Sequence, residues 1–577
     1  MYSSLLLKTF ALLAIIAVNS FAQSGAVVTY PWAEGMPRYS GITVLAGGQN
    51  IDLHSVRANN THFWGGGTDA ADRCDQIPVA MFDFSGEITI SVTVSQGRTF
   101  IPENVVVRPA SRNITPLVNG RTVSFNISEP GQFSVEYGNH NRYALLIFAN
   151  STENFSGTRV LTGGQIHTGT ITLEPNETLY LQAGAVLRGN VVMNSNTRVV
   201  GRGIIDGRNL DTWMRVPAVL PIETWAGNNL EIDGISIFDP NAWAVQIQHA
   251  SNVHINNIKI ITARANGDGI SIQSSNGIRI RNSFIRSWDD GIVIKNYTSR
   301  NSFDIVAENC ILWTDLAQAI EIGVETNKAR ANGMTNSDPQ IYDVTFNKID
   351  VIHAMHKAPI SIHNGDNARI HNIKFTNITV DNYQAGEGDG WNYLIDITNL
   401  TGTGMGGAAE WTTETERGSI YDVLIDNVRV LSGKMPSARF DSFEGGSIFD
   451  IVVRDIFHGA ERINFPNSVV GANSQVRFEF SPEDPISITR NFAAQKNKIA
   501  SFAGIRNGQI QLNLSAGNYA AELYNLQGQM VGKANVTATN GVNAIGLSTD
   551  NLAKGVFILN LKQNGVSVLR QKIGVTR

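Results

Sequence analysis

The sequence predicts an all-β protein, in which a right-handed parallel β-helix follows an N-terminal β-sandwich and precedes a small C-terminal β-sandwich. Three observations carry this prediction: short alternating strands before residue 155, short apolar motifs that repeat from about residue 160, and further short strands after about residue 500. Helical periodicity is almost absent between the repeats. The expected divisions are a signal peptide 1–22, a sandwich 23–155, a β-helix 156–480, a linker 481–505 and a C-terminal sandwich 506–577.

The first 22 residues have the pattern of a secretory signal peptide. Lys8 precedes an apolar run, and Ser20 and Ala22 are small residues before an expected cleavage point after Ala22. A membrane anchor is the alternative, but the run is too short to span a bilayer. No later segment is long and apolar enough to do so. We therefore expect an exported protein, secreted or held at the cell surface, with no membrane span.

The stretch before residue 155 contains alternating runs separated by glycine and proline, at 88–94, 104–110, 121–127 and 132–138. Strands at this spacing are typical of an antiparallel sandwich. Such a domain could be a binding module or a docking platform, and both interpretations stay open here.

Two units recur from about residue 160, as expected for a β-helix whose coils bury inward Ile and Val against one another. One is an alternating apolar run with an asparagine, at 253–260, 278–285, 304–311, 343–350, 373–380 and 422–430. The other is a small residue followed by Ile-x-Ile, at 269–272, 291–294, 319–322 and 359–362. The aligned asparagines, expected to stack at bends, are Asn257, Asn282, Asn309, Asn347 and Asn377.

Charge and cysteine content exclude several classes of protein. The net charge is −5, the pI is near 6.1 and there is no basic stripe, so we expect no nucleic-acid partner. Cys74 and Cys310 alone cannot build a metal cluster, and Cys310 lies in an alternating run typical of a buried strand thiol. No cofactor is expected. A monomer is expected, because a closed stack of coils needs no partner to bury its core.

Aligning the Ile-x-Ile units places three carboxylates together. The residues just before the units are Asp268, Asp290, Gln318 and Ala358, and Trp243 falls in the same column one coil earlier. Residues one coil apart in a sheet lie about 4.8 Å apart. Asp268, Asp289 and Asp290 should therefore converge, with Gly269 and Gly291 breaking the strand alternation and turning the carboxylates outward.

Crowded carboxylates raise one another's pKa, so that one holds a proton while others stay ionised. Glycoside hydrolysis needs such a division between an acid and a base. Turn aspartates or a calcium site are the alternative interpretation, but two Asp-Gly turns in register with an additional Asp favour catalysis.

The motifs at 266–272 and 287–295 resemble the paired Asn-x-Asp and Asp-Asp motifs of polygalacturonase-type β-helix hydrolases. The Ala317–Ala319 stretch stands where polygalacturonases have Gly-His-Gly, and a sandwich precedes the helix; both features are more similar to glycoside hydrolase family 49, the dextranases and isopullulanase. Gly267 replaces that motif's usual Thr. The resemblance implies an inverting hydrolase with Asp289 as general acid and with Asp268 and Asp290 activating water.

Further side chains are expected to bind substrate around the aspartates. Lys295 and His363 follow equivalent Ile-x-Ile pairs and should face a cleft, and Glu321 is a reserve carboxylate. The expected substrate-binding set is Trp243, Gln273, Lys295, Tyr297, Gln318, Glu321 and His363. Trp288 and Trp313 could also stack on sugar rings, and a polar turn with His353, His356 and Lys357 could line a subsite. Ion pairs and coil packing are the alternatives for these residues.

The C-terminal segments 521–533, 552–565 and 569–577 resemble the sorting domain of the type IX secretion system of Bacteroidetes-like bacteria. That resemblance implies a transport address that engages the secretion machinery of a bacterium and takes no part in the chemistry. A small carbohydrate-associated sandwich is the alternative.

These patterns together predict a secreted endo-hydrolase of a polysaccharide, with an α-glucan such as dextran as the favoured substrate. A hydrolase of uronate or sulfated galactan chains would need a cationic subsite, for which Arg286, Lys295 and Lys357 are available. A polysaccharide lyase would use a basic residue and calcium. A non-catalytic glycan-binding adhesin would have no need of three aspartates in register.

Overall fold

A computed structural model describes most of the chain and is almost entirely strand. Its described residues are 25–59, 74–210, 219–221, 227–328, 333–387, 391–399, 417–442, 445–463, 465, 468–481, 500–506, 509–525, 530–548, 552, 555–563 and 566–575. The chain divides into two compact units, Met1–Glu479 and Phe480–Arg577. The expected signal peptide lies outside the described residues, as does most of the expected linker. Among the described residues, no helix has the length and apolarity needed to cross a membrane.

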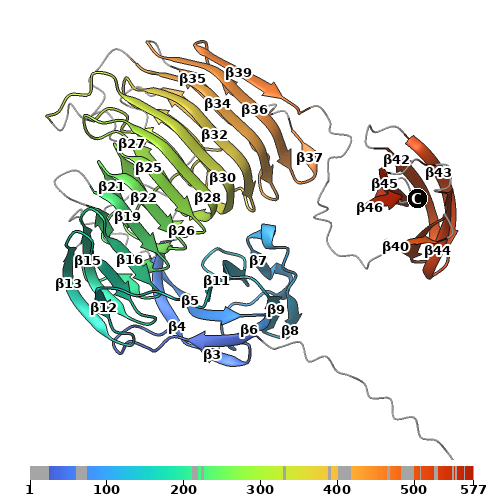
Figure 1. Cartoon of the computed structure of the whole chain (residues 1–577), viewed down its shortest axis with the longest axis horizontal. Helices are drawn as coiled ribbons and strands as arrows, with labels where there is room; N and C mark the ends of the chain where they lie inside the picture. The colour runs from blue at the N-terminus through green and yellow to red at the C-terminus, as the bar shows by residue number, and fades with distance from the viewer. Residues whose placement is uncertain are drawn as a thin grey trace, which may run out of the picture. The chain divides into compact units, whose positions relative to one another are not determined.

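The first unit begins with a sandwich of two sheets (Figure 1). One sheet has the order β1-β5-β11-β10-β7, with β4 also paired to β5: β1 (Ala26–Thr29), β4 (Leu53–Asn59), β5 (Cys74–Ser85), β7 (Val106–Arg108), β10 (Gly131–Glu136) and β11 (Ala144–Ser151). The other has the order β3-β2-β6-β9-β8: β2 (Ile42–Ala46), β3 (Gln49–Ile51), β6 (Ile88–Val94), β8 (Leu117–Asn119) and β9 (Thr122–Ile127). Two 3₁₀ turns, η2 (Pro102–Asn104) and η3 (Ala110–Arg112), flank β7.

Four strands expected from alternating runs are present as β6, β7, β9 and β10. The expectation of a wholly antiparallel sandwich is wrong for one pair, because β5 and β11 run parallel. The chain leaves β5 for the other sheet and returns through β10, and this excursion brings β11 back beside β5 in the same direction.

A 28-stranded parallel β-helix follows, which confirms the predicted fold (Figure 1). The first of its three sheets contains β12 (Arg159–Leu161), β14 (Thr178–Leu181), β16 (Arg198–Gly201), β19 (Asn228–Asp233), β22 (Ser251–Asn256), β25 (Asn276–Arg281) and β39 (Ser474–Glu479). The second contains β13 (Ile166–Leu173), β15 (Val186–Met193), β17 (Ile204–Asp206), β20 (Ser236–Phe238), β23 (Lys259–Ile261) and β26 (Phe284–Ser287). Five long strands cross from the first sheet to the second: β28 (Ser302–Thr314), β30 (Gln340–Ala354), β32 (Arg369–Val380), β34 (Ser419–Val430) and β36 (Ser447–His458).

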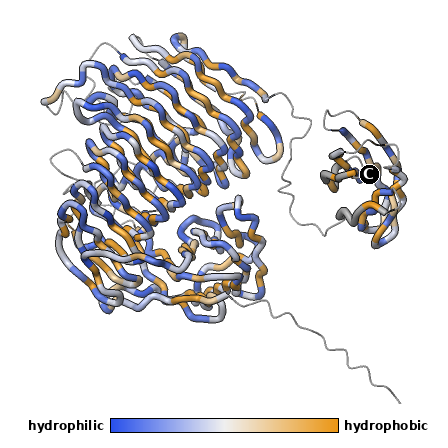
Figure 2. Tube along the Cα trace, viewed as in Figure 1, coloured by the Kyte–Doolittle hydropathy of each residue, from blue (hydrophilic) through white to orange (hydrophobic). Residues whose placement is uncertain are grey.

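The third sheet carries the Ile-x-Ile units. Its strands are β18 (Val219–Pro221), β21 (Val245–Gln248), β24 (Ile270–Gln273), β27 (Ile292–Lys295), β29 (Ile320–Val324), β31 (Ile360–Asn364), β33 (Ile395–Asn399), β35 (Ala438–Ser442) and β38 (Val469–Val470). A two-residue strand, β37 (Glu461–Arg462), pairs antiparallel with β36. Apolar and polar positions alternate along the coils and recur from coil to coil (Figure 2), so the inward Ile and Val form one continuous core.

The corner between the first two sheets is made by residues with left-handed backbone, the conformation that asparagine tolerates best after glycine. Asn257, Asn282, Asn309 and Asn377 have φ between 51° and 56°. Side-chain amides also bond along this corner, as in the 2.6 Å contact from Asn309 Nδ2 to Asn282 Oδ1. The predicted place of Asn347 in this column is wrong: Lys348 occupies it, because Asn347 pairs with Glu308, one residue before Asn309.

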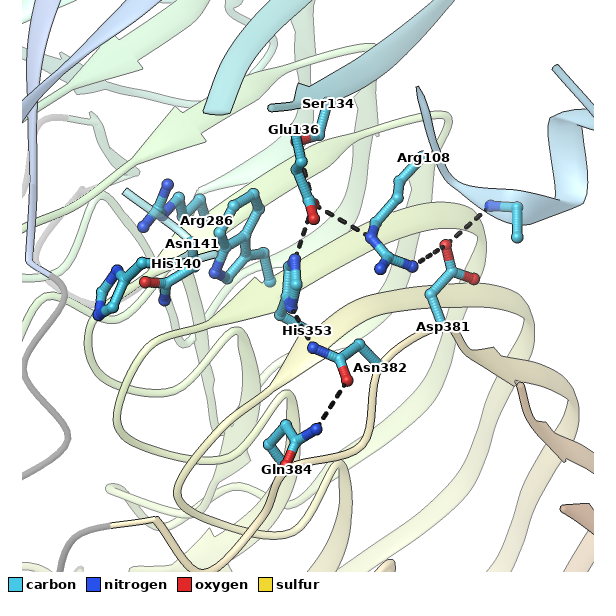
Figure 3. A network of polar contacts seen from close by, with 12 residues as sticks. Arg108, Ser134, Glu136, His140, Asn141, Arg286, His353, Asp381, Asn382 and Gln384 are labelled. Atoms are coloured by element: carbon cyan, nitrogen blue, oxygen red, sulfur yellow. Dashed lines mark hydrogen bonds and ion pairs between the residues drawn. The ribbon is translucent and has the colours of Figure 1, made fainter. Parts of the chain in front are cut away.

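The sandwich packs on the second sheet of the β-helix through a buried apolar cluster that includes Phe148 and Phe284, whose ring centroids lie 5.3 Å apart. A buried polar network adds to this contact (Figure 3). Glu136 Oε1 lies 2.7 Å from His353 Nε2 and 3.1 Å from Arg108 Nε. Arg108 Nη1 lies 3.4 Å from Asp381 Oδ2. These contacts fix the sandwich to the helix within the first unit.

The second unit consists of two antiparallel sheets, as expected for a small sandwich. One has the order β40-β41-β44: β40 (Ala500–Arg506), β41 (Gln509–Leu514) and β44 (Gly541–Ser548). The other has the order β43-β42-β45-β46: β42 (Gly517–Tyr524), β43 (Met530–Ala538), β45 (Gly555–Gln563) and β46 (Val566–Val575).

Cys74 and Cys310 are not joined by a disulfide. Cys310 is buried in β28, as its alternating run predicts, and burial raises its pKa to about 12. Cys74 begins β5, and its Sγ lies 3.6 Å from the carbonyl oxygen of Ala263.

Candidate active site

The structure places Asp268, Asp290 and Gln318 in one column of the third sheet. Each precedes the glycine or alanine that begins an Ile-x-Ile unit, and backbone hydrogen bonds join the coils at this point. The Gly269 N–H donates to the Asp290 carbonyl and the Gly291 N–H donates to the Gln318 carbonyl, both at 2.8 Å. Strand register continues the alignment, since Ile270 pairs with Ile292. The column read from the sequence is therefore the one that forms.

Glycine is required after each aspartate because the coils approach closely there. A Cβ on Gly269 would lie 2.5 Å from the carbonyl oxygen of Gly291, and one on Gly291 would lie 2.5 Å from that of Ala319. Neither glycine has a positive φ. The two glycines thus serve close backbone packing, while Ile270 and Ile292 enter the core.

Asp268 is buried beside a hydroxyl and an ammonium group. Its Oδ2 accepts a 3.0 Å hydrogen bond from Ser271 Oγ and lies 3.6 Å from Lys295 Nζ. Burial raises the pKa of Asp268, and the charge of Lys295 opposes that rise without cancelling it.

Asp289 lies in the turn between β26 and β27 and is 8% exposed. Its Oδ1 accepts a 3.0 Å hydrogen bond from the Asp290 N–H. Burial, followed by the charge of Asp268, raises the pKa of Asp289 to about 7. A carboxyl with this pKa is partly protonated near neutral pH, as a general acid has to be.

Asp290 is less buried, and its Oδ1 accepts a 3.2 Å hydrogen bond from the Gln318 N–H. Burial raises the pKa of Asp290 well above its usual range, and Asp289, Asp268 and Glu321 raise it further. The sequence argument attributed such shifts to crowding alone. In the structure, loss of solvent is the largest cause for all three aspartates, and repulsion is secondary.

Lys295 connects the aspartates to a carboxylate that the sequence analysis missed. Its Nζ lies 3.3 Å from Glu325 Oε2, and Glu325 Oε1 accepts a 2.9 Å hydrogen bond from the Tyr297 hydroxyl. Burial lowers the pKa of Lys295, but the surrounding carboxylates, Glu325 first, raise it well above the usual value. Trp243 completes the group: its ring lies edge-on to Tyr297 at 6.4 Å, with Lys295 Nζ 5.4 Å from the indole centroid.

Gln273 and Gln318 line the same part of the helix. Gln273 pairs with Lys295 in the sheet register, is fully buried, and accepts a 2.8 Å hydrogen bond from Gln246 Nε2. Its own Nε2 has no hydrogen-bond partner among the described residues. Gln318 is 3% exposed and touches Asp290 through its backbone rather than its side-chain amide.

Glu321 and His363 are buried and bonded to each other. His363 Nδ1 lies 2.9 Å from Glu321 Oε2, and Ser361 Oγ also donates to that carboxylate. His363 Nε2 lies 3.3 Å from Asp396 Oδ2. Burial lowers the pKa of His363, but Glu321 and Asp396 raise it to about 10, so this imidazole is cationic at neutral pH. The expectation that His363 faces a cleft does not match this burial.

Asp396 and Arg439 extend the ladder and were not found from the sequence. Two Arg439 nitrogens donate to the two Asp396 oxygens at 2.7 Å. The signal was the motif at 394–397, an Ile-x-Ile unit that begins with Leu394 instead of a small residue. Alignment of the residues that follow the Ile-x-Ile units on neighbouring coils would also have found Glu325. Its backbone carbonyl accepts a hydrogen bond from the Asn296 N–H on the neighbouring coil.

Several weaker candidates are part of the packing. Trp313 is fully buried between Arg286, 3.8 Å from its ring centroid, and His353, at 4.4 Å. His353 belongs to β30 and contacts the sandwich, so the predicted polar turn is wrong for this residue. His356 Nδ1 lies 2.6 Å from the Glu387 carbonyl.

The two remaining candidates of that group lie nearer the third sheet. Trp288 is 6% exposed, and its backbone N–H donates a hydrogen bond to Thr262 Oγ1 at 3.0 Å. Lys357 Nζ lies 3.9 Å from the Trp391 ring centroid. Among the described residues, no three His, Cys, Asp or Glu side chains are grouped so that they could hold a metal ion.

Two parts of the chain match known families. Residues 152–388 match Glycosyl hydrolases family 28, and residues 506–576 match the secretion system C-terminal sorting domain. Over 118 residues the chain is 29% identical to a protein named probable endopolygalacturonase D of Neosartorya fischeri, which covers 20% of this chain and 22% of that protein. The match thus spans about a fifth of the length of this curated relative.

One solved structure shares the fold, and a second is similar over a smaller part of the chain. Dex49A from Penicillium minioluteum superposes with a TM-score of 0.54 at 14% identity, covering 79% of this chain and 96% of that chain. A hyperthermoactive exopolygalacturonase from Thermotoga maritima has a TM-score of 0.40 at 15% identity, covering 56% and 82%. The resemblance to polygalacturonase-type hydrolases and to the family 49 fold is confirmed, as is that of the C-terminus to a sorting domain.

Proposed function

We propose that this protein is a secreted inverting endo-glycoside hydrolase that cleaves a polysaccharide with Asp268, Asp289 and Asp290. The observation that supports this most is the set of three adjoining, mostly buried carboxylates with raised pKa values on one face of the third sheet. A site that holds both a protonated and an ionised carboxyl has what acid–base hydrolysis of a glycosidic bond requires.

In this proposal Asp289 protonates the leaving oxygen, since its pKa near 7 leaves it partly protonated at neutral pH. Asp268 and Asp290 hold the attacking water, and Asp268 takes its proton. Asp268 is suited to the ionised role, because Lys295 lies 3.6 Å away and stabilises its charge. The three carboxyls interact strongly enough that they titrate as a unit, so the proton is shared within the group.

The supporting residues have different parts in this proposal. Trp243 and Tyr297 offer partly apolar rings to a sugar face, and Gln318 offers its amide to a sugar hydroxyl. Gln273 is fully buried, so its part is to support the wall of the site through its hydrogen bond with Gln246. Glu321 and His363 lie on the two following coils, in β29 and β31, and orient the wall beside Asp290.

A neutral α-glucan such as dextran is the favoured substrate. Three cations of the third sheet are paired with carboxylates among the described residues: Lys295 with Asp268 and Glu325, His363 with Glu321 and Asp396, and Arg439 with Asp396. An acidic sugar would have to break one of these pairs to be bound by charge. A neutral sugar does not carry that cost.

Hydrolysis of an acidic or sulfated galactan is the second candidate. The family match over 152–388 and the relative named as an endopolygalacturonase favour it. In that case Lys357, whose Nζ lies 3.9 Å from the Trp391 ring centroid, would be a cation near the bound chain.

Export is the proposed fate of the protein. The match of residues 506–576 to a secretion sorting domain supports delivery outside the cell. In this proposal the secretion machinery recognises the second unit, and the first unit alone catalyses the reaction.

Release of reducing ends from a panel of dextran, pullulan, polygalacturonate and sulfated galactans tests the proposal, with Asp289→Asn run beside the wild type. Cleavage of an α-glucan that is lost in the variant supports both substrate and site. Cleavage of an acidic chain keeps the site and replaces the substrate. A folded protein that binds a glycan equally well with and without Asp289 and cleaves none would be an adhesin.

A further inference from the structure

A cavity of about 130 Å³ lies between the two sheets of the N-terminal sandwich. Its lining comes from strand ends that meet at one end of the sandwich. Tyr39 precedes β2 and Arg98 follows β6 in one sheet, while Asp75 is the second residue of β5 and Tyr137 follows β10 in the other. The volume exceeds a water molecule's share of roughly 30 Å³ and is below that of sites for drug-sized ligands, roughly 300–1,000 Å³. One small ring would therefore fit it.

Tyrosines give this cavity aromatic walls. Tyr137 and Tyr143 have ring centroids 6.4 Å apart, and Tyr39 lies across from them. Tyr137 is buried, and burial raises the pKa of its hydroxyl, which stays a hydrogen-bond donor at all ordinary pH values. Tyr39 and Tyr143 are partly exposed, so their faces are accessible at the rim.

Two exposed arginines and a partly exposed carboxylate stand around these rings. Arg98 Nη2 donates to the Ser40 carbonyl at 3.1 Å, and its guanidinium lies 5.7 Å from the Tyr39 ring centroid. Gly41 leaves the space for it, because a Cβ there would lie 2.5 Å from Arg98 Nε. Arg142 Nε lies 3.7 Å from Asp75 Oδ2 across the opening.

Aromatic faces beside guanidinium and carboxylate groups suit a sugar ring. A pyranose presents C–H groups to an aromatic face and hydroxyls at its edge, and an arginine–carboxylate pair can donate to and accept from neighbouring hydroxyls. A purely apolar ligand would displace water from these charged groups without giving them hydrogen-bond partners. A simple anion would make no contact with the tyrosine ring faces.

We propose that this cavity is a non-catalytic binding site for one pyranose unit of a polysaccharide. The choice of a sugar among small polar rings rests on the proposed function, whereas the existence of the site does not.

The site is fixed relative to the β-helix. Tyr137 follows Glu136, which lies 2.7 Å from His353 (Figure 3). Arg142 follows Asn141, whose amide donates to Asp315 at 3.2 Å. A glycan held in the cavity is thereby kept at a constant place with respect to the aspartates. Such tethering raises the local concentration of the rest of the polymer without any new contact at the bond being cleaved.

Isothermal titration of the full mature chain carrying Asp289→Asn tests the proposal, with isomaltotriose and trigalacturonate as separate probes. We expect two binding sites per chain for one of these probes. Arg98→Ala and Arg142→Ala, both exposed side chains whose loss spares the core, should each weaken one site about tenfold or more. Leu117→Ala, on the exposed edge strand β8, is the matched control and should leave both sites intact.

The two probes separate a neutral from an acidic sugar. A single site that neither arginine substitution affects would overturn the proposal, as would the absence of binding by both probes. In the active enzyme, Arg98→Ala should raise KM for the polymer several-fold and leave kcat for a trisaccharide unchanged. If no glycan is hydrolysed, the arginine-dependent site should still be measurable, so the two proposals can fail independently.

Discussion

Lys295 Nζ lies 3.6 Å from Asp268 Oδ2, so the ammonium group on one coil faces the carboxylate of the coil before it. This cation opposes the rise that burial causes in the pKa of Asp268. It also ties the aspartates to Glu325, 3.3 Å away, and through Glu325 to Tyr297. The charge of Lys295 therefore favours the ionised form of Asp268.

Replacement of Lys295 by methionine should lower kcat/KM at neutral pH by roughly 10²-fold, the size of effect expected when a proton-transfer group is mistuned. Without the ammonium, the pKa of Asp268 rises further, and the acidic limb of the pH–rate profile moves to higher pH. Lys295→Arg keeps the charge and should retain more activity. Lys328→Met is the matched control, since Lys328 lies 4.6 Å from the Tyr297 ring on this side of the molecule. An unshifted acidic limb in Lys295→Met would contradict this role.

The pH dependence of catalysis should report Asp289. If Asp289 is the general acid, activity requires its protonated form, and kcat/KM should fall as the pH rises through about 7. A pH series with the wild type on its best substrate measures this limb. An alkaline limb that begins only above pH 9 would assign the acid to another group.

The aspartates should cost the protein stability. The folded-state pKa of Asp289 is about 7, above the usual 3.9, so its stabilising contribution is complete only below about pH 4 and is lost as the pH rises through 7. Asp289→Asn removes that cost while keeping an oxygen for the Asp290 N–H. The free energy of unfolding should increase by roughly 2–4 kcal/mol at pH 8 and change little at pH 4. Denaturant titrations at the two pH values measure the difference, and an equal effect at both would be inconsistent with this origin.

Glu136 should have the opposite pH dependence. Burial alone would raise its pKa, but His353 and Arg108 lower it to about 2. Its contribution is therefore present above the unfolded pKa of about 4.3 and is lost as the pH falls toward 2. Glu136→Gln should destabilise the first unit by roughly 3 kcal/mol at pH 7, because Arg108 is left with one fewer carboxylate. Thermal unfolding from pH 7 to pH 3 checks this. The variant and the wild type should converge at the acid end, and a constant difference would contradict the account.

The repeat made much of the site predictable. Because the Ile-x-Ile units keep their pattern between loops of different length, Asp268 and Asp290 could be placed on neighbouring coils from sequence alone. The same regularity gave a wrong prediction at Asn347. The left-handed position of the corner is occupied by Lys348, the next residue in the chain. Local pattern did not distinguish the two, because only the strand pairing fixes the corner.

Contacts between distant segments were beyond sequence reasoning. Glu136 and His353 are 217 residues apart and follow no shared motif. His353 therefore looked like a loop residue near a subsite, whereas the structure buries it under the sandwich. The burial of His363 was not predicted for a related reason. Its partner Asp396 lies in an Ile-x-Ile unit that does not begin with a small residue.

The stereochemistry of the first product tests the central claim most directly. Proton NMR of the wild-type reaction, recorded before mutarotation, gives the anomeric configuration of the new reducing end. An inverting site built from Asp268, Asp289 and Asp290 predicts that an α-linked glycan first yields the β-anomer. Initial release of the α-anomer would mean retention through a covalent intermediate, and would contradict the roles assigned to the three aspartates.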